Sequence, residues 1–170
     1  MKDEYIDAFR GVVQDTQNST GYNLPEHVEA YIVMLLADHV EKVDFLPSSS
    51  FAETFLKLKS GDREAKELGD TCLFVSGVYP KYGNKHGINR RYYQDIGSTS
   101  YDIVSLQLNK ELFSTLSKNF VFLSSFIHHS VDSSKRARSI LFRYCRHRCY
   151  LVLHHRTIYY QYCLHHLDIQ

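Results

Sequence analysis

Apolar side chains that recur at three- and four-residue steps constrain this chain more than any other feature. The clearest run lies between residues 25 and 43, where Val28, Ile32, Leu35 and Val43 keep helical spacing while acidic residues mostly take the opposite side. Similar spacing predicts further helices over residues 1–14, 50–58, 62–79, 89–108 and 112–127. The pattern predicts an all-α fold, a single-domain bundle of five to seven helices, in which short loops favour an up-and-down arrangement.

Local signals set the expected helix boundaries. Pro25 suits the first position of a helix, because the N–H that proline lacks has no partner there. Ser50 followed by Glu53 matches a capping box, and Asn89 can cap the helix that follows it. The polar stretch 14–22, which contains a glycine, is predicted to be a turn.

The overall charge is nearly balanced, since Lys and Arg total 20 against 19 for Asp and Glu. That balance gives no reason to expect nucleic acid or an anionic membrane as a partner of the whole chain. The longest uncharged apolar run, residues 30–37, is far shorter than the roughly 20 residues that a spanning helix needs. Three acids within the first seven residues do not fit a signal peptide, and the four cysteines lack the spacing of a small secreted protein. We therefore expect a cytoplasmic protein.

Composition changes sharply near residue 127. Residues 127–170 hold 7 of the 10 His and 3 of the 4 Cys, and they contain no Gly, Pro or Glu. The charge is 13 minus 17, or −4, for residues 1–126, and 7 minus 2, or +5, for the remainder. These differences predict a helical domain over 1–127 and a poorly specified basic tail over 128–170.

Three explanations of the tail stay open. It is a basic arm for an anionic partner such as nucleic acid, a metal site, or sequence never selected to fold, as a shifted reading frame would produce. The candidate zinc ligands are Cys145, Cys149, Cys163 and His165, although their spacing fits no common zinc finger closely. A nucleotide enzyme is disfavoured, because the chain has neither a Walker loop nor a Gly-x-Gly-x-x-Gly motif, and the identity of any cofactor stays unknown.

Several glycines and aromatic residues stand at fixed offsets between residues 68 and 101. The segments are Leu68-Gly69-Asp70, Leu73-Phe74-Val75-Ser76-Gly77-Val78-Tyr79-Pro80, Tyr92-Tyr93, Ile96-Gly97 and Ser100-Tyr101. This pattern resembles an uncharacterised family of small bacterial all-helical proteins with no assigned activity. The resemblance implies a helical fold and a bacterial cytoplasmic setting, and it transfers no catalytic residue.

Two polar residues on apolar helix faces are candidates for a site. His39 shares its face with Leu35 and Val43, so it either packs inside or ligates a metal or haem. Asp70 lies beside Gly69 on the apolar side of its helix, and a buried carboxylate needs a partner. We expect that partner to be Arg90, Arg91 or a tyrosine hydroxyl of the following helix, which would make Asp70 an anchor between helices.

The sequence favours a non-enzymatic helical protein that acts by contact with another protein or with its own copy. Its aromatic surface is predicted around Tyr79, Tyr82, Tyr92 and Tyr93. One alternative is a small-ligand or metal-dependent helical enzyme with a pocket near His39 and Asp70. The other alternative is nucleic-acid binding through the basic tail.

Overall fold

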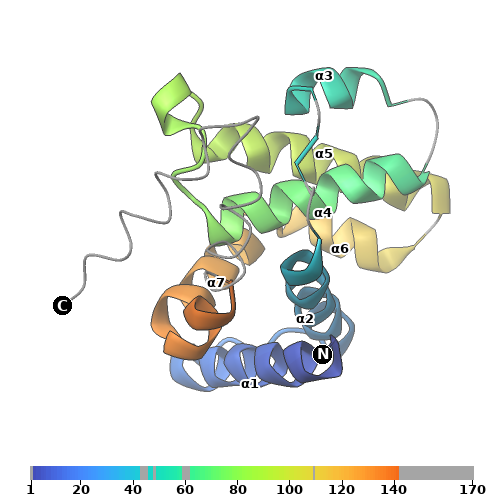
Figure 1. Cartoon of the computed structure of the whole chain (residues 1–170). Coiled ribbons are helices and arrows are strands. Elements are labelled where there is room, and N and C mark those ends of the chain that lie inside the picture. The colour runs from blue at the N-terminus through green and yellow to red at the C-terminus, as the bar shows by residue number, and fades with distance from the viewer. Residues whose placement is uncertain (1, 43–45, 48, 59–61, 109, 142–170) are drawn as a thin grey trace.

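The computed structural model describes residues 2–42, 46–47, 49–58, 62–108 and 110–141 (Figure 1). These residues form helices and no strand, which confirms the all-α prediction, and none of the helices is both long and apolar enough to cross a membrane. Residues 135–141 are also helical. The other elements are α1 (Lys2–Thr20), α2 (Glu26–Glu41), α3 (Phe51–Leu56), α4 (Asp62–Val78), the 3-10 helix η1 (Asn84–His86), α5 (Arg90–Leu108), α6 (Glu111–Lys118) and α7 (Phe120–Ser133).

Several of the helices cross one another, so the helices do not form one parallel set. Figure 1 shows α4 and α5 across the upper half of the molecule and α1 across the bottom, with α2 and α7 viewed nearly end-on between them. Helix α4 packs mainly against α5 and α7, while α1 packs against α2 and α7. The up-and-down arrangement is therefore wrong, because short loops set which helices are neighbours but not the angle at which they cross.

Two of the predicted helix boundaries need correction. Helix α1 continues to Thr20 through the stretch expected to turn, and the hydroxyls of Thr16 and Thr20 bond to carbonyls four residues earlier. The turn comes only at Gly21, where φ is 72°. The helix predicted over 112–127 is two helices, α6 and α7, which meet at Asn119. The caps at Ser50 and Asn89 are confirmed, since both side chains accept a backbone N–H three residues later.

The core does not end at residue 127. Helix α7 runs on to Ser133, and the hydroxyl of Ser134 then accepts the amide of Ala137 at 3.1 Å, which begins the 135–141 helix. Val131, Ala137 and Leu141 are all buried in the same core as the earlier helices. The helical domain thus reaches at least residue 141, and the remainder of the predicted tail lies outside the described residues.

Candidate functional site

The carboxylate of Asp70 lies between three helices and holds three internal partners. Its Oδ1 accepts the hydroxyl of Tyr31 from α2 at 2.5 Å and the hydroxyl of Tyr101 from α5 at 2.8 Å. Its Oδ2 pairs with the ammonium of Lys66, one turn earlier on α4, at 2.6 Å. Only 9% of the Asp70 side chain is exposed. Both oxygens therefore carry bonds to the protein itself.

The glycine before Asp70 makes this arrangement sterically feasible. A Cβ at Gly69 would lie 2.7 Å from two ring carbons of Tyr101, which is closer than two carbon atoms can pack. The ring of Tyr101 packs against the backbone of Gly69, and the carboxylate of Asp70 accepts the hydrogen bond from the Tyr101 hydroxyl. The rings of Tyr31 and Phe113 pack around Tyr101 with centroids 6.2 and 5.8 Å away. The Leu68-Gly69-Asp70 segment is thus a docking point for α5.

Burial decides the protonation of this cluster. Desolvation, reinforced by the charge of Asp70, raises the pKa of both Tyr31 and Tyr101 well above the ordinary value. Both hydroxyls stay protonated near neutral pH and donate to the carboxylate. This geometry suits a hydrogen-bonded anchor between helices, which is the role expected for Asp70. The sequence predicted a tyrosine of the following helix as a partner, and that tyrosine is Tyr101 of α5.

Neither arginine named as a partner of Asp70 contacts it. The Nε of Arg90 donates to the carbonyl of Ser76 at 2.8 Å, near the end of α4, where a cation complements the helix dipole. Its terminal nitrogen lies 3.4 Å from the hydroxyl of Ser124, which also accepts the amide of Gln94 at 2.7 Å. Arg91 lies 3.8 Å from Asp95 in an exposed pair. Arg90 therefore belongs to a second polar cluster, between α4, α5 and α7.

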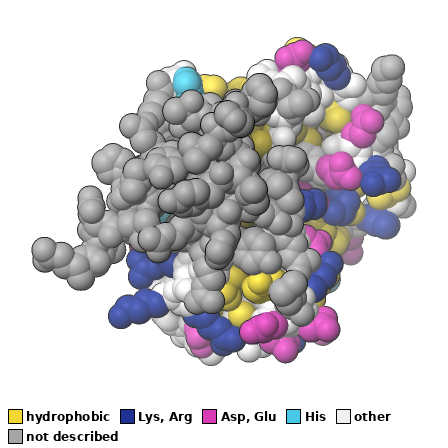
Figure 2. Space-filling view, viewed as in Figure 1, with side chains coloured by type: hydrophobic (Ala, Val, Ile, Leu, Met, Phe, Trp, Pro, Cys, Tyr) yellow, Lys and Arg dark blue, Asp and Glu magenta, His cyan; other side chains and the backbone are white. Residues whose placement is uncertain are grey.

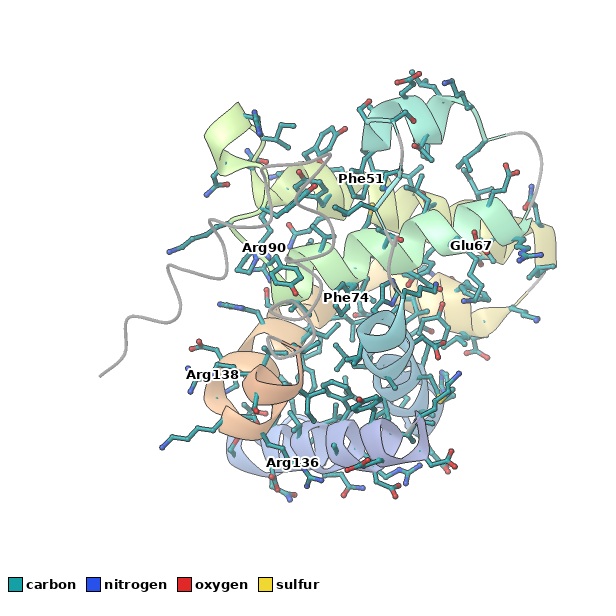
Figure 3. The ribbon with its side chains drawn as sticks, viewed as in Figure 1. Phe51, Glu67, Phe74, Arg90, Arg136 and Arg138 are labelled. Carbon is teal, nitrogen blue, oxygen red and sulfur yellow. The ribbon has the colours of Figure 1, made fainter. Side chains whose placement is uncertain are left out.

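His39 is buried and stacked, with its ring centroid 4.5 Å from that of Phe74 at an interplanar angle of 17°. Figure 3 labels Phe74 on α4. Its Nδ1 lies 2.8 Å from the carbonyl of Leu35, which accepts the ring N–H. Burial lowers the pKa of His39 to about 4, and the hydrogen bond to Leu35 and the charges of Asp70 and Asp38 only partly oppose that effect. The imidazole is therefore neutral near pH 7 and acts as a packed ring.

The four tyrosines predicted to form an aromatic surface all pack against other parts of the fold. Tyr93 is buried, with the rings of Phe51 and Tyr82 at 5.0 and 5.6 Å, while Tyr79, Tyr82 and Tyr92 are partly buried against the core. The hydroxyl of Tyr92 accepts the amide of Ala52 at 2.9 Å, which fastens the start of α3 to α5. Burial removes Tyr93 from any contact surface, whereas Tyr79, Tyr82 and Tyr92 are only half-buried and their role in contact stays a prediction.

An exposed aromatic surface does occur elsewhere, where the loop after α1 meets the start of α7. Tyr22 and Val121 are each 60% exposed and Phe122 is 39% exposed. The rings of Tyr22 and Phe122 meet edge to face with centroids 5.3 Å apart, and Phe122 also contacts the buried ring of Phe126 at 6.2 Å. We call these three residues the Tyr22 patch.

Sequence reasoning missed Tyr31, Gln94, Ser124 and the Tyr22 patch. Tyr31 fits the apolar stripe of its helix, so nothing marked its hydroxyl as a partner of a residue 39 positions later. Ser124 carried a weak signal, since it is a polar residue between Leu123 and Phe126 on an apolar helix. Tyr22 and Phe122 are far apart in sequence, and only the packing of α1 against α7 brings their rings together.

The predicted metal ligands Cys145, Cys149, Cys163 and His165 lie outside the described residues. Within the described ranges, no three His, Cys, Asp or Glu side chains come close enough together to hold a metal ion. The resemblance to a bacterial helical family stays a prediction. The chain matches no protein-family model, no curated protein and no solved structure.

Proposed function

We propose that this chain is a helical contact protein that associates with a second copy of itself through the Tyr22 patch. The observation that carries the proposal is the pair of exposed rings, Tyr22 and Phe122, held against each other by two different elements. Aromatic side chains in a rigid setting supply much of the binding energy of protein interfaces and lose little entropy on binding.

The surroundings of the Tyr22 patch favour a second copy over a different partner. A two-fold contact brings the same surface of both copies together, so a rim that carries charge of one sign would repel itself. Gly21 and Asn23, which flank Tyr22 along the chain, are exposed and uncharged. A stable interface covers about 800 Å² on each partner, so the Tyr22 patch would be its centre and neighbouring surfaces of α1 and α7 its rim.

The buried polar groups support a contact protein over the alternative of an enzyme near His39 and Asp70. Both oxygens of Asp70 already serve helix packing, and His39 is a neutral ring stacked on Phe74. We also propose a cytoplasmic location, because Cys72, the cysteine within the described residues, is a free buried thiol.

Sedimentation equilibrium over a range of protein concentrations tests self-association. The double variant Tyr22→Ser/Phe122→Ser is expected to weaken dimerisation at least tenfold, because it removes the two aromatic anchors. Leu106→Ser is the matched control, since Leu106 is 81% exposed but lies outside the Tyr22 patch, and it should dimerise like the unchanged protein. A monomer at every concentration, or equal weakening by Leu106→Ser, would contradict the proposal.

A further inference from the structure

A separate surface, at the end of the described chain, carries three cations. Lys135 and Arg136 are exposed and Arg138 is half-buried, and all three belong to the helix whose Ala137 and Leu141 are buried. At about 100° per residue, the three cations share an arc of about 160° on the side of the helix that faces away from the core. Figure 3 labels Arg136 and Arg138, and Figure 2 shows dark blue side chains at the lower left, where α7 lies in Figure 1. We call these residues the 135–138 face.

Elsewhere on the described surface, acidic side chains pair with arginines. On the 135–138 face, no described acid does so. Three arginines on other helices pair with an acid one turn away: Arg10 with Asp7 at 3.0 Å, Arg63 with Glu67 at 3.2 Å and Arg91 with Asp95 at 3.8 Å. None of the cations of the 135–138 face has an ion pair with a described residue.

The break at Ser134 explains the missing pair. Asp132 stands three and four residues before Lys135 and Arg136, which is the spacing of an ion pair on a continuous helix. Helix α7 ends at Ser133, however, and Ser134 takes an extended conformation with φ −104° and ψ 110°. The chain changes direction there, so the carboxylate and the cations are not on one helical face. No acid among the described residues therefore neutralises this positive charge, and an external anion can meet it.

The sequence after residue 141 indicates which anion fits. It adds Arg143, Arg146, Arg148 and Arg156 against the single acid Asp168. Guanidinium groups match the geometry of phosphate oxygens, and tyrosines interleave with these arginines at positions 144, 150 and 159. Tyrosine rings stack on nucleic-acid bases, which are accessible in single strands, whereas an acidic peptide would use the cations and not the rings.

We infer that the 135–138 face binds the phosphates of a single-stranded nucleic acid. The 135–138 face and the Tyr22 patch share no residue, so the two proposals are tested separately. Nucleic-acid binding can be absent while self-association is observed, and self-association can be absent while nucleic-acid binding is observed. Each phosphate contact to a single strand contributes about 0.7 to the slope of log affinity against log salt concentration, so three contacts contribute about 2.

Fluorescence anisotropy with the full chain and a labelled oligothymidylate of about 20 nucleotides tests this assignment. The triple variant Lys135→Gln/Arg136→Gln/Arg138→Gln should lower the salt slope by about 2. Between about 50 and 200 mM salt, the unchanged protein should then lose roughly 20-fold more affinity than the variant. The matched control Arg10→Gln/Arg63→Gln/Arg91→Gln removes the same charge from ion-paired positions and should keep the slope of the unchanged protein.

Three results would overturn the assignment. An unchanged slope in the 135–138 variant would show that its cations make no phosphate contact. An equal loss in the control variant would show that only the net charge matters. Equal affinity and slope for poly-glutamate, or for a DNA duplex of the same length, would show that any anion suffices. Circular dichroism of both variants, expected to match that of the unchanged protein, confirms that the comparison is between folded chains.

Discussion

A single carboxylate joins helices α2, α4 and α5. The hydroxyls of Tyr31 and Tyr101 donate to one oxygen of Asp70, and the ammonium of Lys66 pairs with the other oxygen. The pair with Lys66 is weakened by solvent, because 41% of that lysine side chain is exposed. Most of the contribution of Asp70 to stability therefore lies in the two buried hydroxyl bonds.

Replacing Asp70 tests that account. Asp70→Ala leaves two buried hydroxyls without an acceptor, and we expect it to lower the free energy of unfolding by about 3 kcal/mol. Tyr101→Phe removes one bond and should cost about 1–2 kcal/mol. Urea denaturation measures both values. The exposed Asp102 of α5 is the control, and Asp102→Ala should change stability by less than about 0.5 kcal/mol. Equal losses for Asp70→Ala and Asp102→Ala would show that the anchor does not stabilise the fold.

His39 makes stability depend on pH. Burial lowers the pKa of this side chain from 6.5 to about 4, so the unfolded chain binds a proton that the folded chain excludes. The stability present above pH 6.5 is therefore lost as the pH falls toward 4, by as much as about 3 kcal/mol at about 1.4 kcal/mol per pH unit. His39→Phe should flatten urea-derived stability over that window, while His27→Gln, at an exposed position, should not. Parallel curves for His39→Phe and the unchanged protein would contradict this result.

Among the helices, glycines decide how closely the elements approach. A Cβ at Gly97 of α5 would lie 2.7 Å from the Cβ of Cys72 on α4 and would also meet the ring of Phe120 on α7. Gly97 therefore lets α5 approach both α4 and α7 closely. Gly11 of α1 is different, because a Cβ there would meet nothing within 4 Å.

The two glycines should therefore respond to alanine in opposite directions. Gly97→Ala overpacks the crossing of α4, α5 and α7, and we expect a loss of about 1–3 kcal/mol. Gly11→Ala meets open space and should stabilise by up to about 1 kcal/mol, because alanine favours the helix. Thermal unfolding followed by circular dichroism distinguishes them. A gain in stability from Gly97→Ala would show that the three helices have room to separate.

For the whole molecule, the hydrophobic core extends beyond residue 127. The change in composition near residue 127 suggested that the following residues add little, yet Val131, Ala137 and Leu141 are buried. The charge and composition of a segment indicate which side chains its surface presents. They do not predict whether a few apolar residues of that segment are buried in the core.

Leu141→Ala measures the contribution of this last helix. Removing a buried leucine side chain from a packed core should cost about 3 kcal/mol in urea denaturation of the full chain. Leu106→Ala, at a position 81% exposed, should change stability by less than about 0.5 kcal/mol. If the two variants are equally stable, residues 135–141 do not belong to the cooperative core.

The sequence by itself determined the helices and several of their ends. The three-and-four spacing of apolar residues is a local property of the chain, and so are the caps at Ser50 and Asn89, so each can be recognised without knowing any tertiary neighbour. The same spacing marked Asp70 as a buried carboxylate that needs a partner.

The tertiary structure alone decided which partners meet. Tyr31 and Tyr101 reach Asp70 across 39 and 31 positions of sequence, and Tyr22 meets Phe122 only because α1 packs on α7. It also decided that Tyr93 is buried while Tyr22 is exposed, although both are tyrosines in sequence runs of similar polarity. Side-chain exposure and long-range pairing depend on the angles at which helices cross, and those angles follow from packing between surfaces that no local pattern specifies.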